Sequence, residues 1–102
     1  MKGTEKQVKW AEDLINKAFS TIDRREAEFE AAAESATSES RRSVYIQNAE
    51  NYRFTRRWLT EKLKEEKYQV ASKIIAMRAV FERYFEDIRV IDDIVGGSNS
   101  YL

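Results

Sequence analysis

The sequence predicts an all-α protein, and three features lead to that fold class. The chain has no proline, and its three glycines lie near its two ends, so no strong helix breaker occurs over residues 4–95. A sheet protein of 102 residues would need several turns rich in glycine, asparagine or aspartate. Apolar residues instead recur at the three- and four-residue spacing of a buried helix face. We therefore expect one helical domain over residues 1–95 and a flexible C-terminal tail over residues 96–102.

The first helix is expected to begin at Thr4 and to run to about residue 33. Thr4 and Gln7 fit the capping box, in which each side chain accepts a hydrogen bond from the backbone N–H of the other residue. Trp10 lies beside the apolar stripe that follows, where it either widens the core face or stays exposed as an anchor for a partner. The stripe comprises Val8, Ala11, Ile15, Ala18, Ile22 and Phe29, with Leu14 and Phe19 beside it.

A segment rich in serine and threonine, residues 34–40, is the best candidate for the first turn. Hydroxyl side chains favour caps and turns because they compete for nearby backbone groups. We expect Thr37 or Ser38 to cap a second helix. Gly96 and Gly97 are then expected to end the last helix, because glycine commonly follows a helix C-terminus.

The apolar residues between these two turns form two stripes that are out of register. Over residues 70–95 they alternate in steps of four and three, which is the a/d seam of a coiled coil. Extending that seam backwards reaches Lys67, Leu63, Thr60 and Arg56, so it does not continue the stripe over residues 44–63. The mismatch predicts a second turn at residues 64–69. The result is an antiparallel three-helix bundle, with helices of about 30, 28 and 28 residues.

Two other arrangements fit the same pattern. In the first, one helix of more than about 50 residues forms a hairpin with the first helix and buries its spare seam in a homodimer. Such a chain could also be a self-associating structural coiled coil with no other partner. In the second, the break lies at residues 48–51 instead of residues 64–69. The sequence leaves the oligomeric state open between these arrangements.

The composition argues against catalysis and metal binding. Histidine and cysteine are both absent, which removes the commonest general base, the commonest metal ligand and all thiolate chemistry. The adjacent acids at residues 86–87 and 92–93 would point about 100° apart on a helix, so neither pair converges on one atom. The sequence has no glycine-rich phosphate loop and no hydrolase-type serine motif. We therefore predict no enzyme activity, no cofactor and no metal.

Charge and hydropathy suggest where the protein acts. No run approaches the roughly 20 apolar residues of a spanning helix, and the N-terminus lacks the apolar centre of a signal peptide. The 18 basic and 18 acidic residues give a net charge of zero, whereas proteins that coat nucleic acid usually carry a positive excess. We therefore expect a cytoplasmic protein with no membrane partner.

One stretch is uneven in charge: RRSVYIQNAENYRFTRRW, residues 41–58. It holds five arginines against a single acid, and four large aromatic residues are interleaved with them. Arginine and aromatic residues together are typical of nucleic-acid grooves and of protein hot spots. The candidate partner-binding residues are Arg41, Arg42, Tyr52, Arg53, Arg56, Arg57 and Trp58.

The same stretch also has an explanation within the fold. An antiparallel second helix would place Arg41 and Arg42 near Glu30 and Glu34. The arginines would then form surface ion pairs of small energetic value, and the aromatic residues would lie in the core. The functional interpretations are a face that binds a larger protein with an acidic or phosphate-like surface or, alternatively, a face that binds nucleic acid.

The segment GTEKQVKWAEDLI, residues 3–15, resembles a G-[ST]-x-K-Q-x-x-W-A-x-x-[IL] motif, here G-T-x-K-Q-x-x-W-A followed by Leu14, at the N-terminus of small uncharacterised proteins of bacterial phages and mobile elements. The resemblance implies a phage or mobile-element origin and a bacterial cytosolic setting. Many small phage proteins bind and block a host component, anti-CRISPR proteins among them, so it also implies an inhibitor of a host defence or nucleic-acid-handling machine. The matching residues are Gly3, Lys6, Gln7, Trp10, Ala11 and Leu14.

Overall fold

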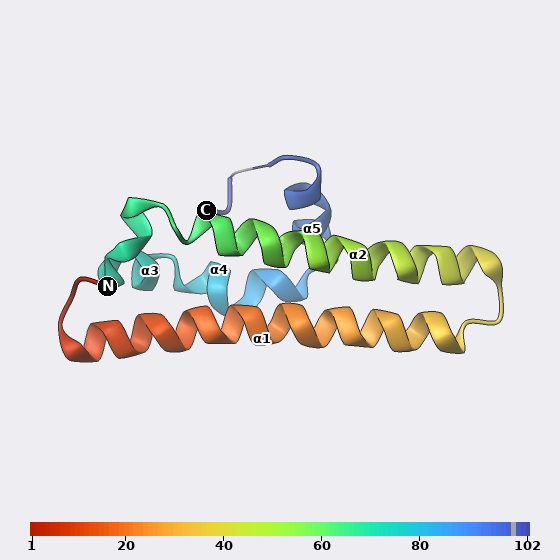
Figure 1. Ribbon diagram of the computed structural model, residues 1–102, viewed down its shortest axis with the longest axis horizontal. Helices are drawn as coiled ribbons and strands as arrows, with labels where there is room; N and C mark the ends of the chain where they lie inside the picture. Colours follow the sequence, from red (N-terminus) through yellow and green to blue (C-terminus); the bar gives the residue numbers. More distant parts are fainter. Residues whose placement is uncertain (99) are drawn as a thin grey trace.

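Two long helices, α1 (Glu5–Ser35) and α2 (Glu39–Lys62), form an antiparallel hairpin that organises the fold (Figure 1). The computed structural model describes residues 1–98 and 100–102. After the hairpin, the chain runs back along it as η1 (Glu66–Gln69), α3 (Ala71–Ala76), α4 (Arg78–Arg83), η2 (Tyr84–Glu86) and α5 (Ile88–Val95). The prediction of an all-α helical bundle is confirmed.

Both helices of the hairpin begin where the sequence predicts. The Thr4 hydroxyl oxygen accepts a hydrogen bond from the Gln7 backbone N–H at 3.2 Å, and the Thr4 N–H donates to the Gln7 side-chain oxygen at 3.0 Å. The expected capping box is therefore confirmed. Ser38, one of the two expected caps, accepts from the Arg41 N–H at 3.2 Å and begins α2.

The second turn lies at the mismatch between the two apolar stripes. Helix α2 ends at Lys62, and a turn at residues 63–65 leads into η1, which overlaps the predicted turn at residues 64–69. Both rival arrangements are wrong in their helix boundaries. Helix α2 passes through residues 48–51 without a break, and it does not continue into α3 as one long helix.

The third helix predicted over residues 70–95 is not continuous, so that prediction was wrong. Met77, with φ −104° and ψ 22°, separates α3 from α4. Asp87, with φ −88° and ψ 116°, separates η2 from α5. The Asp87 carboxylate accepts a hydrogen bond from the Arg89 backbone N–H at 2.9 Å and so caps α5. No proline or glycine marks either break.

The break at Asp87 allows one segment to cover both helices of the hairpin. Helices α3 and α4 and the η2 turn pack against α1, whereas α5 packs against α2. A straight helix would keep a single stripe in contact with a single groove. The buried residues shift accordingly: Ile74, Phe81 and Ile91 of the expected seam are buried, but Phe85 takes the core place expected for Tyr84.

The C-terminal residues return to the bundle. The buried Tyr68 hydroxyl donates a hydrogen bond to the backbone oxygen of Leu102 at 2.6 Å. The Tyr101 hydroxyl donates to the Asp93 carboxylate at 2.7 Å. The segment expected to be a flexible tail thus has two residues against the folded core, and Asn99, which also falls within it, lies outside the described residues.

The core lies between the hairpin and its covering segment, and it does not reach the far end of the hairpin. We call that end, residues 29–48, the hairpin tip. There α1 and α2 extend past α5 as two helices alone, as Figure 1 shows for the described part of the chain. The molecule is correspondingly elongated, with extents of 52 × 24 × 18 Å. Side chains at the tip are therefore available to a partner.

Candidate protein-binding surfaces

The antiparallel hairpin sets some arginines of residues 41–58 against acids of α1. Arg53 Nε lies 2.8 Å from a Glu26 carboxylate oxygen, and Arg53 also pairs with Glu30. These contacts raise the pKa of Arg53, chiefly through its hydrogen bond to Glu30. Arg56 lies 3.3 Å from the Asp23 carboxylate. The explanation within the fold therefore accounts for Arg53 and Arg56.

The first two arginines of the stretch are placed differently. Arg42 pairs with Glu39 on its own helix and donates a hydrogen bond to the Ala36 backbone oxygen at 3.0 Å. Arg41 is exposed and forms no ion pair within the described residues. Neither arginine forms an ion pair with Glu30 or Glu34, contrary to what the antiparallel arrangement suggested.

Tyr52 is a core residue, which corrects its prediction as a partner-binding residue. Its side chain is fully buried, and its hydroxyl donates a hydrogen bond to the Phe85 backbone oxygen at 2.8 Å. The Arg25 Nε–H donates to the same hydroxyl at 3.4 Å. Burial raises the pKa of the Tyr52 hydroxyl, and Arg25 opposes that shift. Tyr52 therefore joins α2 to α1 and to η2.

The outer face of α2 carries a mixed aromatic and cationic surface. Phe54, Arg57 and Trp58 are three and four residues apart, so their side chains are neighbours on the helix. Phe54 is 39% exposed, and Trp58 is half-buried with part of its ring against the core. Arg57 is exposed and forms no ion pair within the described part of the chain. We call these three residues the α2 outer cluster.

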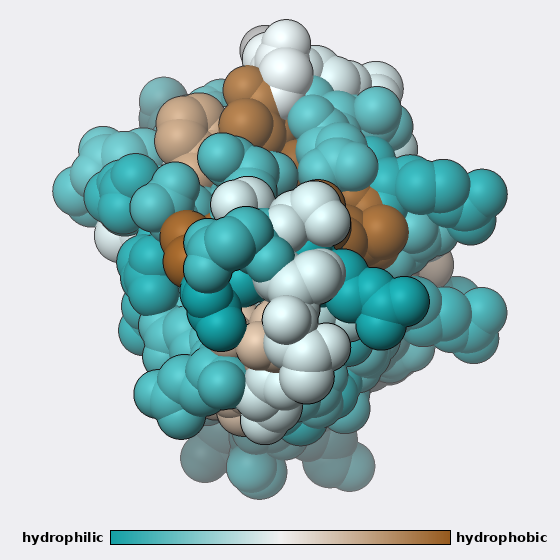
Figure 2. Space-filling model, turned by 90° about the vertical axis from the view of Figure 1, so that its right-hand side faces the viewer, coloured by the Kyte–Doolittle hydropathy of each residue, from teal (hydrophilic) through white to brown (hydrophobic). Residues whose placement is uncertain are grey.

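The hairpin tip exposes apolar side chains that were not among the predicted site residues. Val44 is 57% exposed and Ile46 is 45% exposed. Figure 2, which looks onto the tip, shows hydrophobic residues on both sides of the pale turn. The sequence could have indicated these exposed residues, because α2 has apolar residues on more than one side. In a hairpin this region has only one neighbouring helix, so one of those sides must stay exposed.

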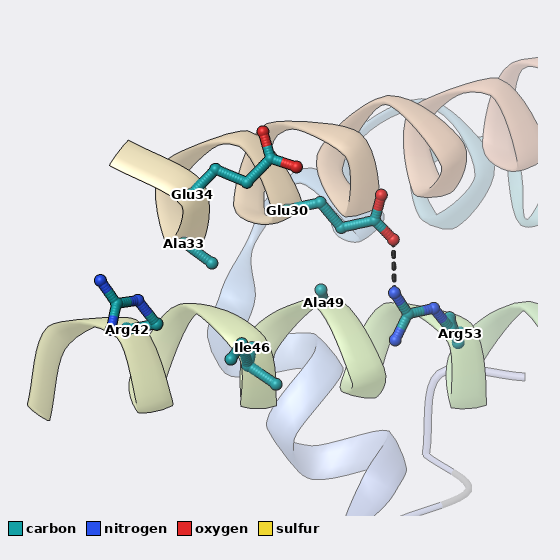
Figure 3. A pocket seen from close by; sticks show the side chains of 7 residues that line it. All are labelled: Glu30, Ala33, Glu34, Arg42, Ile46, Ala49 and Arg53. Atoms are coloured by element: carbon teal, nitrogen blue, oxygen red, sulfur yellow. Dashed lines mark hydrogen bonds and ion pairs between the residues drawn. The ribbon is translucent and has the colours of Figure 1, made fainter. Parts of the chain in front are cut away.

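A shallow groove of about 420 Å³ runs between α1 and α2 at the tip, and we call it the tip groove (Figure 3). Its charges are separated by helix: Glu30 and Glu34 come from α1, and Arg42 and Arg53 come from α2. Of the two acids, Glu30 pairs with Arg53, whereas Glu34 forms no ion pair among the described residues. The apolar lining consists of Ala33, Ala49 and, at the α2 edge, Ile46.

Trp10 lies outside the core, so the expectation that it widens the core face was wrong. Its side chain is 46% exposed. It borders a shallow hollow between α1 and α4 together with Asp13, Lys17 and Arg83. The other expectation, that Trp10 is an exposed anchor for a partner, stays a prediction.

The acidic pairs near the C-terminus form structural contacts. Glu86 pairs with Arg24 of α1. Asp87 lies 2.9 Å from Arg89, and hydrogen bonds from that residue lower the pKa of the Asp87 carboxyl. No group of three or more potential metal ligands converges within residues 1–98 and 100–102.

Neither a protein family nor a curated protein or solved structure was found to match the chain. Among the described residues, no helix combines the length and apolar character needed to cross a membrane.

Proposed function

We propose that this chain is a non-enzymatic protein-binding module whose α2 outer cluster contacts an acidic surface of a larger protein. The proposal is carried by the coincidence of exposed aromatic surface and an unpaired arginine at Phe54, Arg57 and Trp58. An arginine offers two parallel hydrogen bonds to a carboxylate. A partly exposed tryptophan supplies the apolar anchor that is typical of protein hot spots.

The remaining arginines favour a protein partner over a nucleic acid. A nucleic-acid surface needs several cations directed at the phosphate backbone. Arg42, Arg53 and Arg56 are each held by an acid of this chain. Within the described residues, only Arg41 and Arg57 of the stretch form no ion pair. The local excess of positive charge is therefore largely balanced inside the fold.

The N-terminal resemblance supports a more specific proposal. The segment over residues 3–15 resembles a motif of small phage and mobile-element proteins. We propose that the chain acts in the bacterial cytoplasm and inhibits a host defence or nucleic-acid-handling machine, in the manner of anti-CRISPR proteins. Blocking such a machine requires a binding surface and no catalytic group.

The test captures a partner and then measures its affinity for variants. The tagged parent recovers a binding protein from a bacterial lysate, and biolayer interferometry gives the Kd. Arg57→Glu should raise the Kd at least about tenfold, or ~1.4 kcal/mol, with an unchanged melting temperature. Lys73→Glu is the matched control, because Lys73 is exposed on α3 and forms no ion pair in the described part of the chain. It should bind like the parent.

Two results would count against this proposal. A folded Arg57→Glu variant with parental affinity would remove the α2 outer cluster as the site. Recovery of nucleic acid would favour the alternative function, provided that affinity falls steeply with salt. For nucleic acid, log K should fall with log salt by nearly one unit of slope for each phosphate neutralised.

A further inference from the structure

We infer that the tip groove is a self-association surface, on which a second copy of this chain docks with its α1 over the α2 of the first. The inference goes beyond the proposed function and does not depend on it, because it is tested at Glu34, Arg42 and Ile46 near the hairpin tip, whereas the α2 outer cluster begins at Phe54. It is carried by the distribution of charge, by exposed apolar surface and by an acid without an ion pair.

The charges along one side of the hairpin are divided between its two helices. On α1 the acids recur every three or four residues, which places them on one side of that helix. They face a row of arginines on α2. The acids are Asp23, Glu26, Glu30 and Glu34, and the arginines are Arg42, Arg53 and Arg56.

This division selects one way of pairing two copies. If α1 of one copy lies over α2 of the other, acids face arginines along the whole side. If α1 instead lies over α1, acids face acids, and like charges brought together at an interface disfavour that pairing. The favoured pairing has a twofold axis parallel to the hairpin, with both tips pointing the same way. The same patch then serves both copies, as in most dimers.

The groove also supplies the apolar contact that a dimer needs. Ala33 and Ala49 form the nearly buried floor of the groove between the two helices, and their small side chains leave it open to a side chain from another molecule (Figure 3). Ile46 borders the groove and is 45% exposed. An axis parallel to the hairpin keeps each residue at the same height. Ile46 of one copy therefore packs over the Ala33 region of the other.

The second copy accounts for a charge that the single chain leaves unpaired. Glu34 lines the groove but forms no ion pair among the described residues. In the dimer it faces Arg42 of the second copy, and the symmetry provides this contact twice. A basic peptide would suit the acids of α1 but meet the arginines of α2, and an acidic peptide would do the reverse. Apart from Glu34, the charges of both rows are already paired within one chain, and a second copy keeps opposite signs facing each other across the interface.

Sedimentation velocity over a concentration series tests the inference through charge reversal. Glu34→Arg and Arg42→Glu each place two like-charge contacts in the dimer, so each alone should raise the dimer Kd at least about tenfold. An equimolar mixture of the two variants should dimerise again. In the mixed dimer, one contact is parental and the other is reversed on both sides. Lys73→Glu should dimerise like the parent.

If Glu34 and Arg42 only stabilised the fold of the single chain, mixing the two variants would not restore the dimer. Arg42→Glu also removes contacts to Glu39 and Ala36, so Ile46→Asp provides an independent test. Because Ile46 is exposed in the single chain, this variant should keep the parental circular dichroism spectrum but lose the dimer.

Several results would overturn the inference. These are a parent that stays monomeric up to about 1 mM, a mixture of the two charge variants that does not dimerise, and a folded Ile46→Asp variant that still dimerises. A monomeric parent that loses binding to a different protein on Ile46→Asp would assign the groove to that protein instead. The proposed function is tested separately, through the affinity of Arg57→Glu for the captured partner. The proposed function and the dimer can therefore fail independently.

Discussion

Removing the Tyr52 hydroxyl tests whether the C-terminal segment is anchored to the hairpin. This buried hydroxyl donates a hydrogen bond to the Phe85 backbone oxygen at 2.8 Å. Tyr52→Phe keeps the ring and its stacking on Phe29, where the two ring centroids are 6.0 Å apart. The change therefore removes the hydroxyl while leaving the volume of the core nearly the same.

The magnitude follows from the burial of the groups involved. A buried carbonyl that loses its donor costs about 1–3 kcal/mol. The contact from Arg25 to the same hydroxyl is long, at 3.4 Å, and adds little. We expect Tyr52→Phe to lower the free energy of unfolding by about 1–2 kcal/mol. At about 4–8 °C per kcal/mol for a domain near this size, the melting temperature should fall visibly.

The assay is urea unfolding followed by far-UV circular dichroism, with the slope of the transition checked against the parent. Tyr45→Phe is the matched control. Tyr45 is half-buried, and its hydroxyl forms no hydrogen bond within the described residues. It should unfold within about 0.5 kcal/mol of the parent. If Tyr52→Phe were as stable as Tyr45→Phe, the reasoning about the anchor would be refuted.

Three further predictions concern stability. Asp87→Ala removes the cap of α5 and should lower the urea midpoint at pH 7. The difference in urea midpoint between variant and parent should shrink as pH falls through the lowered pKa of Asp87, because the parent then loses its charged carboxylate as well. Burial raises the pKa of Tyr52 and Tyr68, so stability should decline above about pH 10, and less steeply after both are changed to phenylalanine. Ile91→Ala should lower the free energy of unfolding by about 2–5 kcal/mol, and Ile88→Ala should lower it clearly less, because only Ile91 of the two is fully buried. Equal losses for the two variants in urea titrations would support a continuous seam.

The sequence predicts the hairpin well because its signals are local. Thr4 and Gln7 form a cap within one turn of helix, and Ser38 caps α2 in the same way. The break before α5 is not marked by the apolar stripe, because it lies where the covering segment crosses from α1 to α2. Predicting a helix from a regular apolar seam assumes that the seam packs against a single straight helix. That assumption fails here, because the segment packs first on α1 and then on α2.

The predicted site residues lie on more than one face of α2, and the sequence does not show which of them are exposed. Arg56 and Arg57 are adjacent in sequence and point about 100° apart on α2. Arg56 pairs with Asp23 and lies over the Phe19 ring, whereas Arg57 is exposed to solvent. Which arginine is available depends on how α2 is rotated against α1. That rotation is set by the packing of the whole bundle and not by the stretch itself.

Tryptophan fluorescence tests most directly whether a partner covers the α2 outer cluster. The chain has two tryptophans, so Trp10→Phe leaves Trp58 as the only reporter. When the captured partner binds this variant, Trp58 emission should shift to the blue and acrylamide quenching should fall. In the reciprocal variant, Trp58→Phe, measured at partner concentrations at which the complex still forms, the exposed Trp10 should keep its emission and quenching. A complex that forms while Trp58 stays unchanged and Trp10 becomes protected would contradict the account.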